Sequence, residues 1–250
     1  MRPIITLLTD FGTVDGYVGE MKGVLLTGMP GADIVDITHD IPPQDVDRGR
    51  LTLARVWRRF PPGTIHVVVV DPGVGSSRDA IAVSSEGYFL VGPDNGVLSA
   101  ALLAASARVV SLSVSQHASA TFHGRDVFAP AAAALARGEL IESLGPDAAN
   151  PIIRRTPEPT RRADGAIEGE VIFVDRFGNA VTNLVGARGG TVELGTLAID
   201  LRRTYAEVEA GKPLALVGST GFVEIAVRNG DAARTLGLKR GSIVALRTAH

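Results

Sequence analysis

The sequence predicts an α/β N-terminal domain with a mainly parallel sheet and flanking helices, followed by a smaller all-β, barrel-like C-terminal domain. Strand-like and helix-like segments alternate up to about residue 145, which is typical of a parallel sheet covered by helices. The run "VVVV" at 67–70 fits a strand that is buried on both faces. Beyond residue 168 the helical period nearly vanishes, and short β segments alternate with turn residues.

The N-terminal segments follow one another in a regular order. A strand, "IITLLT", precedes a helix for which Asp15 is a plausible N-cap. Pro61, Pro62 and Gly63 end a second helix, and a hairpin turning at Glu86–Gly87 follows the third strand. The expected strands span 4–9, 32–38, 64–70, the two arms of 80–93, and 107–114; the expected helices span 15–29, 44–60, 96–105 and 126–139.

The composition of the chain changes after residue 145. Residues 145–168 contain four prolines, four arginines and small polar residues, which is typical of a linker or long connection. We therefore expect a catalytic α/β domain at 1–150, a linker at 151–167 and a β-barrel-like domain at 168–250.

The overall composition excludes several classes of protein. With 45% apolar residues in 250, a large core is expected, and a net charge of −2 argues against nucleic-acid binding. The absence of cysteine excludes disulfides and thiolate chemistry. No apolar run approaches the ~18 residues of a membrane span, and the N-terminus lacks the apolar region of a signal peptide. We expect a soluble, cytoplasmic protein.

The glycine-rich stretch "VVVVDPGVGSSRD" raises the first functional question. It lacks the spacing and the lysine of a P-loop, and it leads into a strand rather than the helix of a dinucleotide fingerprint. What remains is Asp71 at the carboxyl end of a strand, where α/β sheets bind ligands, with Arg78 one loop away. An alternative is equally compatible with the sequence: Asp71 caps its own loop and Arg78 lies on the surface.

Three further loops of the N-terminal half carry polar candidates. Asp10 and Asp15 lie near the end of the first strand, where two carboxylates could bind a metal or the hydroxyls of a ribose. His123 opens a helix and suits proton transfer near neutral pH, with His39 as its competitor. Asn95 lies in the turn "GPDNG" before a helix, where functional and structural roles are equally compatible with the pattern.

The C-terminal half offers two polar turns. "VDRFGNAVTNL" contains Asp175, Phe177 and Asn179, and "VGSTGFVEIAVRNG" contains Ser219 and Glu224. Amide-rich turns with an aromatic neighbour suit a purine or a zwitterionic amino acid, although ordinary turn formation accounts for most of these residues.

Six motifs taken together resemble one known family. In chain order they are "TDFGTVDGYVGEMKG", "VDITHDIPPQDV", "VVVVDPGVGSSRDAIAV", "GPDNGVL", "TFHGRDVFAPAAA" and "DRFGNAVTN". The chain is similar over nearly its whole length to the S-adenosyl-L-methionine hydroxide adenosyltransferases, which are related to the fluorinases and chlorinases.

The resemblance implies hydrolysis of S-adenosylmethionine to adenosine and methionine, in a homotrimer whose active sites lie between the α/β domain of one subunit and the barrel of its neighbour. It implies a catalytic set of Asp71, Arg78 and His123. S-adenosylmethionine is the substrate, and we expect no separate cofactor, no metal, no nucleic acid and no membrane partner. The expected substrate-binding residues are Asp10, at the ribose hydroxyls, with Phe11, Asp15, Asn95, Phe122, Asp175, Phe177, Asn179, Ser219 and Glu224.

Two other functions are weighed against hydrolysis. A related halogenase would form a 5′-halo-5′-deoxyadenosine, but those relatives carry an inserted loop where only "SSEGYFL" joins "AIAV" to "VGPDNG" here. A fixed carboxylate at Asp71 would also repel a halide by about 1–4 kcal/mol at ~4 Å, whereas water pays no such cost. A non-catalytic adenosine-binding or S-adenosylmethionine-binding protein needs none of the three catalytic residues, yet all are present. The sequence leaves open whether Asp71 or His123 accepts the first proton.

Overall fold

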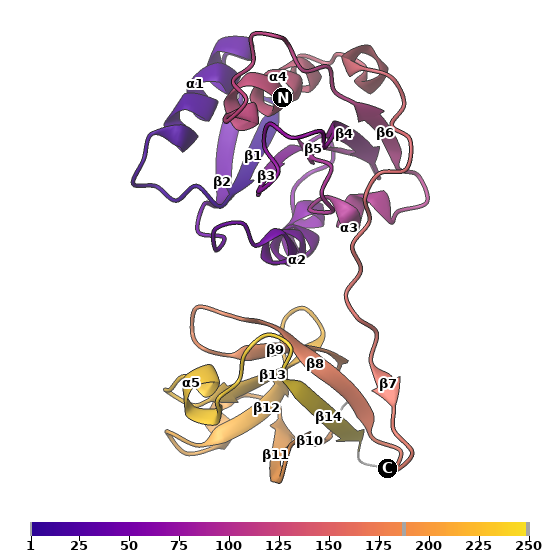
Figure 1. Cartoon of the computed structure of the whole chain (residues 1–250). Coiled ribbons are helices and arrows are strands. Elements are labelled where there is room, and N and C mark those ends of the chain that lie inside the picture. Colours follow the sequence, from indigo (N-terminus) through magenta and orange to yellow (C-terminus); the bar gives the residue numbers. More distant parts are fainter. Residues whose placement is uncertain (1, 187–188, 249–250) are drawn as a thin grey trace. The chain divides into compact units, whose positions relative to one another are not determined.

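The computed structural model describes residues 2–186 and 189–248. The chain forms two compact units that meet in the sequence between Arg155 and Thr156 (Figure 1). The N-terminal unit combines a sheet with helices, and the C-terminal unit is built almost entirely of strands. The expected order of an α/β domain followed by a smaller β-barrel is therefore confirmed.

The N-terminal unit contains a six-stranded sheet in the order β2-β1-β3-β5-β4-β6. Its strands are β1 (Ile4–Thr9), β2 (Asp33–Thr38), β3 (Ile65–Val69), β4 (Ala80–Ser85), β5 (Tyr88–Pro93) and β6 (Arg108–Ser111). β2, β1, β3 and β5 pair in parallel, whereas β4 pairs antiparallel with both β5 and β6. The prediction of a mainly parallel sheet is therefore wrong, and the sheet is mixed.

The cause of the mixed sheet is the tight β4–β5 hairpin. Its two-residue turn is Glu86–Gly87, as the sequence predicts, and both residues have positive φ, at 51° and 82°. Such turns match the twist of two antiparallel strands and leave no room for a crossover helix. β4 must therefore run against its neighbour.

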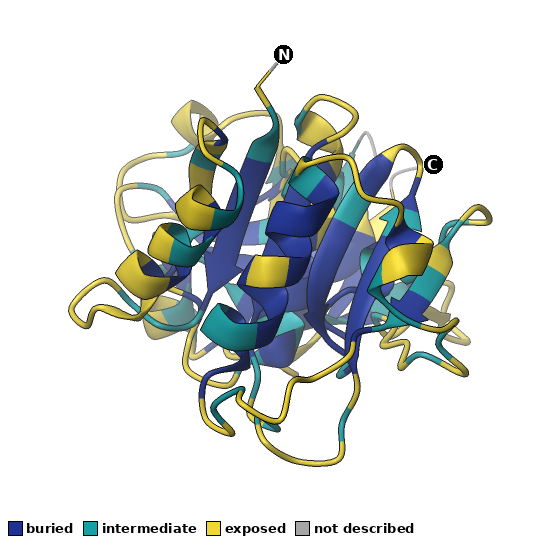
Figure 2. Cartoon of the chain, turned by 90° about the horizontal axis from the view of Figure 1, so that it is seen from above, coloured by how far each residue is buried: buried dark blue, intermediate teal, exposed yellow. Residues whose placement is uncertain are grey.

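Helices cover both faces of this sheet. They are α1 (Tyr17–Gly28), α2 (Val46–Val56) with the short η1 (Trp57–Arg59), α3 (Ser99–Leu102), the π-helical turn η2 (Gly124–Phe128), α4 (Ala129–Ala136) and η3 (Ile141–Leu144). α1 and α4 pack on one face, over Leu7 and Val67, while α2 and α3 pack on the other, over Leu8 and Val68. The inner strands are buried and the edge strand β2 has no buried residue. Figure 2 shows buried strands beside helices whose outward faces are exposed.

The helices differ from the expected ones mainly at their ends. Asp15 does not cap α1: Gly16 is at the N-cap, no side chain caps the helix, and Asp15 lies one residue too early. Asp45 caps α2 instead, because its Oδ1 accepts the Arg48 backbone N–H at 2.9 Å. The expected helix at 126–139 is divided into η2 and α4.

The C-terminal unit is a closed barrel of seven strands. Neighbouring strands follow the order β14-β10-β11-β12-β13-β9-β8, and antiparallel pairing of β8 with β14 closes the ring. They are β8 (Ile167–Val174), β9 (Ala180–Val185), β10 (Gly190–Leu194), β11 (Leu197–Arg202), β12 (Pro213–Val217), β13 (Phe222–Val227) and β14 (Ile243–Thr248). β7 (Thr160–Arg161) adds to β8, and η4 (Tyr205–Glu207) and α5 (Ala232–Leu236) lie in connections. Closure leaves few free strand edges.

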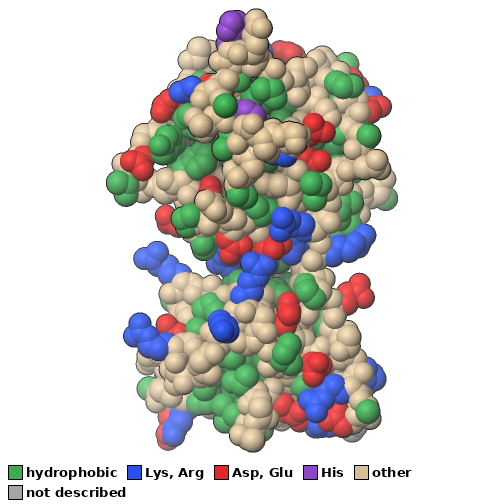
Figure 3. All heavy atoms as spheres, in the orientation of Figure 1, with side chains coloured by type: hydrophobic (Ala, Val, Ile, Leu, Met, Phe, Trp, Pro, Cys, Tyr) green, Lys and Arg blue, Asp and Glu red, His purple; other side chains and the backbone are tan. Residues whose placement is uncertain are grey.

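Charged side chains of both signs are interspersed on the visible face of each unit (Figure 3), in keeping with the net charge of −2. Within the described ranges, no helix is both long enough and apolar enough to cross a bilayer.

Candidate active site

The candidate site forms at the carboxyl edge of the parallel strands. β1 and β3 pair in parallel with Thr9 opposite Val69, so Asp10 and the Val70–Asp71 segment leave neighbouring strands at the same edge. Ligands of open α/β sheets bind at this edge.

Asp71 and Arg78 form a buried ion pair. Arg78 Nε donates to Asp71 Oδ1 at 2.9 Å, and Arg78 Nη2 donates to Asp71 Oδ2. Only 4% of the Asp71 side chain and 10% of the Arg78 side chain are exposed. The alternative of a surface arginine is therefore wrong. A bidentate pair of this kind fixes the plane of the carboxylate.

A glycine explains how the loop after Asp71 reaches the next segment of the site. Gly75 has a φ of +75°, and a Cβ at this position would lie 2.3 Å from the carbonyl oxygen of Ala120. Only glycine accepts both the left-handed backbone and this close approach. The contact brings the 71–79 loop against the segment that leads into His123.

His123 completes a cluster with Asp71 and Arg78. Its Nδ1 lies 2.9 Å from Arg78 Nη2, and the Phe128 ring packs near both side chains, 5.5 Å from the Arg78 guanidinium carbon and 6.5 Å from the imidazole centre. An arginine can only donate, so Nδ1 must be the acceptor, and the ring is neutral with its proton on Nε2. Burial lowers the pKa of His123, and the nearby Arg78 charge lowers it further.

Asp10 lies beside an aromatic group at the same edge. Its Oδ2 accepts the Gln44 backbone N–H at 2.7 Å, and Gln44 has a left-handed φ of 67°. The rings of Phe11, Tyr17 and Phe122 pack edge to face with centroids 5.4–6.0 Å apart. The end of β1 and the segment that carries His123 are thereby joined.

His39, the other histidine considered, supports the end of β1. It is buried, its Nδ1 lies 2.8 Å from Thr9 Oγ1, and its Nε2 lies 3.1 Å from Asp36 Oδ1. The Thr9 hydroxyl in turn accepts the Phe11 backbone N–H at 3.2 Å. His39 therefore holds the loop of Asp10, and His123 is the histidine placed with Asp71.

Asp15 and Asn95 occupy different environments. Asp15 is exposed in the loop before α1. Asn95 is half-buried, and its Nδ2 donates to the carbonyl oxygen of Val70 at 2.8 Å. Asp94, beside it, is buried, and burial raises its pKa.

The candidates of the C-terminal unit lie in two turns of the barrel. Between β8 and β9, Asp175 Oδ1 accepts the backbone N–H groups of Phe177 and Asn179 at 2.8 and 2.9 Å, and its Oδ2 accepts the Asn179 side chain at 3.0 Å. This turn leaves Phe177 74% exposed. Ser219 is exposed between β12 and β13, and Glu224 is half-buried on β13, packed against Gly218.

The N-terminal cluster contains a fixed carboxylate, a permanent cation and a neutral imidazole. Across the described part of the chain, no group of His, Asp and Glu is arranged to hold a metal ion. Sequence reasoning missed Phe128, Tyr17 and the Gln44 backbone. None of these leaves a usable signal: Phe128 follows His123 by five positions, which is not an α-helical spacing, and the two meet through the π-helical turn η2. The cluster can accept a proton and orient a small nucleophile.

The fold and this cluster define a two-domain α/β and β-barrel protein with a carboxylate–guanidinium–imidazole site. Residues 5–145 match the SAM hydroxide adenosyltransferase N-terminal domain, and residues 169–245 match the C-terminal domain of the same family. The chain belongs to the SAM hydroxide adenosyltransferase family.

Three relatives illustrate the likeness. The (R)-S-adenosyl-L-methionine hydrolase of Thermus thermophilus is 43% identical, over 98% of this chain and 100% of that protein. A crystal structure of an uncharacterized conserved protein from Thermotoga maritima superposes with a TM-score of 0.88 at 34% identity, covering 97% of this chain and 99% of the other. A fluorinase of an Actinoplanes species is more distant, at 27% identity over 99% of this chain and 98% of that protein.

Proposed function

We propose that this protein hydrolyses S-adenosyl-L-methionine to adenosine and L-methionine. The observation that carries the proposal is the buried cluster of Asp71, Arg78 and His123 in a chain 43% identical to a protein named as such a hydrolase. That relative's name specifies the (R) configuration at the sulfonium, and we assign the same preference here.

The reaction is an in-line displacement at the ribose C5′ carbon. The oxygen of a water molecule bonds to C5′ while the C5′–S bond breaks, and its electron pair remains on the sulfur of neutral methionine. The water loses one proton to the protein, which later releases it to solvent. Because the sulfonium is already a good leaving group, alignment and deprotonation of the water are the main tasks.

The geometry supports Asp71 as the proton acceptor. The one accepting nitrogen of His123 is occupied by Arg78, and its other nitrogen carries a proton. Each oxygen of Asp71 accepts one bond from Arg78 and keeps a further lone pair. Arg78 stays protonated and holds the carboxylate in place, while His123 offers its Nε2–H as a donor.

The remaining substrate contacts belong to the same proposal. We assign the ribose hydroxyls to Asp10, whose Oδ1 remains to accept them, and the walls around them to Phe11 and Phe122. Asp15 and five residues of the C-terminal unit complete the assigned contacts: Asp175, Phe177, Asn179, Ser219 and Glu224. The expected substrate contact of Asn95 stays a prediction outside this set, because its side-chain amide is bonded to Val70 and Val97. A homotrimer with sites between subunits, a reaction without a cofactor, and a cytoplasmic location are also parts of this proposal.

A halogenase is the competing reaction, and the short β4–β5 hairpin argues against it because the two-residue turn leaves no inserted loop. The buried negative charge of Asp71 also opposes halide binding.

The test is incubation of the purified protein with (R)- and (S)-S-adenosylmethionine in ¹⁸O-labelled water, with and without chloride. We expect adenosine carrying one ¹⁸O at the 5′ position, methionine in equal amount, and faster turnover of the (R) epimer. Adenosine at the level of a protein-free control would contradict the proposal. 5′-Chloro-5′-deoxyadenosine as the main product would establish the halogenase instead.

A further inference from the structure

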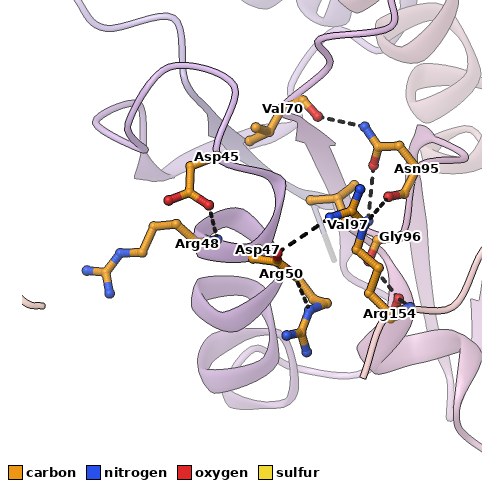
Figure 4. Close-up of polar contacts among 10 residues, drawn as sticks. Asp45, Asp47, Arg48, Arg50, Val70, Asn95, Gly96, Val97 and Arg154 are labelled. Carbon is orange, nitrogen blue, oxygen red and sulfur yellow. Dashed lines mark hydrogen bonds and ion pairs between the residues drawn. The ribbon is translucent and has the colours of Figure 1, made fainter. Parts of the chain in front are cut away.

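The turn at 94–99, which follows β5, joins two parts of the N-terminal unit that are far apart in sequence. On one side it contacts Val70, which lies between the end of β3 and Asp71 (Figure 4). On the other it contacts the connecting segment, residues 145–159 between η3 and β7, at Ile152 and Arg154.

Asn95 makes the contact to the end of β3, the strand that leads into Asp71. Its Nδ2 donates to the Val70 carbonyl oxygen at 2.8 Å, and its Oδ1 accepts the Val97 backbone N–H at 3.1 Å. Val70 is fully buried, lies just beyond the last residue of β3, and precedes Asp71. The Asn95 side chain therefore fixes the peptide unit from which Asp71 projects.

The Val70–Asp71 peptide is also restricted by packing of Val70 against α2. A Cβ at Gly49 of α2 would lie 3.0 Å from Val70 Cγ2 and 3.2 Å from Val97 Cγ2. The helix thus lies directly against both residues. A shift of the 94–99 turn cannot be absorbed at Val70 without disturbing this packing.

The connecting segment is bound to the turn by three hydrogen bonds. The Ile152 backbone N–H donates to Asp94 Oδ1 at 2.8 Å, and the Arg154 backbone N–H donates to Ser99 Oγ at 2.8 Å. Arg154 Nε donates to the Asn95 carbonyl oxygen at 2.9 Å. These contacts end one residue before the boundary between the two units.

Two further features show that the Arg154 side chain is fitted to this place. Gly96 has a φ of +91°, and a Cβ there would lie 2.4 Å from Arg154 Cγ, so only glycine leaves room for the arginine. Arg154 Nη1 also lies 3.4 Å from Asp47 Oδ2, in the first turn of α2.

We propose that Asn95 and Arg154 are positioning residues for Asp71. Asn95 holds the Val70 peptide directly, and Arg154 holds Asn95 by anchoring the connecting segment on the turn. The orientation of the catalytic carboxylate thereby depends on how the connecting segment is docked. This inference rests on the proposed function for its kinetic test, but not for its structural test.

Asn95→Asp is the most specific variant. It keeps the size of the side chain and the acceptor for Val97, but replaces the donor to Val70 with an oxygen that repels the carbonyl. We expect kcat to fall by about 100-fold, the effect of a small misplacement of a reacting group, with KM changed by less than about 3-fold. Asn150→Asp, which introduces the same charge at an exposed position of the connecting segment, should leave both constants unchanged.

Arg154→Ala removes the side-chain anchor and leaves the two backbone bonds. We expect a fall in kcat of about 2- to 10-fold, the equivalent of one hydrogen bond, and partial recovery in Arg154→Lys. Arg155→Ala is the matched control, because Arg155 is exposed and makes no hydrogen bond or ion pair within the described residues.

Hydrogen exchange of the intact protein provides a readout that does not depend on activity. We expect faster exchange at residues 68–79 in Asn95→Asp and Arg154→Ala, with exchange in the barrel and in both control variants unchanged.

Wild-type kcat and wild-type exchange in Asn95→Asp would overturn the inference. A raised KM with normal kcat and normal exchange would do so too, and would make Asn95 a direct substrate contact. If the wild type forms no adenosine, the proposed function fails, and the exchange pattern alone then decides whether Asn95 and Arg154 hold the strand end.

Discussion

Arg78 Nη2 lies 2.9 Å from His123 Nδ1 and donates at the same time to Asp71. One guanidinium group thus fixes a carboxylate and selects the tautomer of an imidazole. The Arg78 charge also disfavours protonation of His123, which burial already opposes. The three side chains therefore behave as one unit, and altering any member should affect the other two.

Replacing Asp71 with asparagine tests its role as proton acceptor. The amide keeps the shape of the side chain but loses its basicity and its charge pairing with Arg78. We expect kcat to fall by about 10²- to 10⁴-fold, the usual contribution of a general base. The measurement is single-turnover formation of adenosine, with substrate binding followed by calorimetry. Asp79→Asn, at an exposed neighbouring carboxylate, should retain normal turnover. Full activity in Asp71→Asn would remove this residue from the mechanism.

The state of His123 predicts the acid side of the pH–rate profile. Its pKa lies below the ordinary value of 6.5, so the ring stays neutral at neutral pH. On acidification, activity should be retained through pH 6.5 and lost only as pH falls through the lowered pKa, when a proton on Nδ1 would meet the Arg78 N–H. The measurement is kcat/KM between pH 5 and pH 8.

Two variants separate the contact of His123 from its titration. Asparagine can place an amide oxygen near the position of Nδ1, whereas alanine cannot. His123→Asn should therefore be more active than His123→Ala, and it should lack the acid limb. An unchanged acid limb in His123→Asn would assign that titration to another group.

Replacing Gly75 with alanine should lower both stability and activity, because it displaces the loop that carries Asp71 and Arg78. Alanine at this position meets both a left-handed φ of +75° and the Ala120 carbonyl oxygen. Relief requires the 71–79 loop and the segment before His123 to move apart. We expect a loss of at least about 1 kcal/mol of stability from the backbone alone, together with a large fall in kcat. Chemical denaturation and adenosine formation measure the two effects. Gly73→Ala, whose Cβ would make ordinary contacts from 3.4 Å, is the milder comparison, and equal behaviour of the two variants would contradict the argument.

The sequence predicts much of this fold because its signals are local. Continuous apolar runs locate β1 and β3, and Glu86–Gly87 locates the hairpin turn. The direction of β4 follows from that same hairpin, yet the overall alternation of strands and helices favoured a mainly parallel sheet. An aspartate near a helix start is a common cap, so the sequence predicts Asp15 at the N-cap, but the chain enters α1 through Gly16.

The site is predictable in part for a related reason. Asp10 and Asp71 follow buried strands, so a parallel pairing places them at one edge. The bonds from Asn95 to Val70 and from Arg154 to Asn95 span 25 and 59 positions, and neither leaves a periodic pattern. The close approach of Gly75 to Ala120 is equally invisible, because it depends on the paths of two loops.

The stability of the N-terminal unit should depend on pH through His66, which the proposed reaction does not use. His66 is fully buried in β3, with Nδ1 2.7 Å from Thr6 Oγ1, and burial lowers its pKa from 6.5 to about 4. In the unfolded chain His66 binds a proton near pH 6.5, whereas in the folded protein it does so only near pH 4. The unfolded state therefore binds more protons between these values, and the free energy of unfolding must fall as pH decreases through this window. At pH 5 the free energy of unfolding should be about 2 kcal/mol lower than at pH 7.5.

Urea unfolding at pH 5 and pH 7.5 measures this difference. His66→Asn should be less stable at both but lose this part of the pH dependence, while His117→Asn, at an exposed histidine, should retain it. An equal pH dependence in wild type and His66→Asn would show that other groups cause the effect.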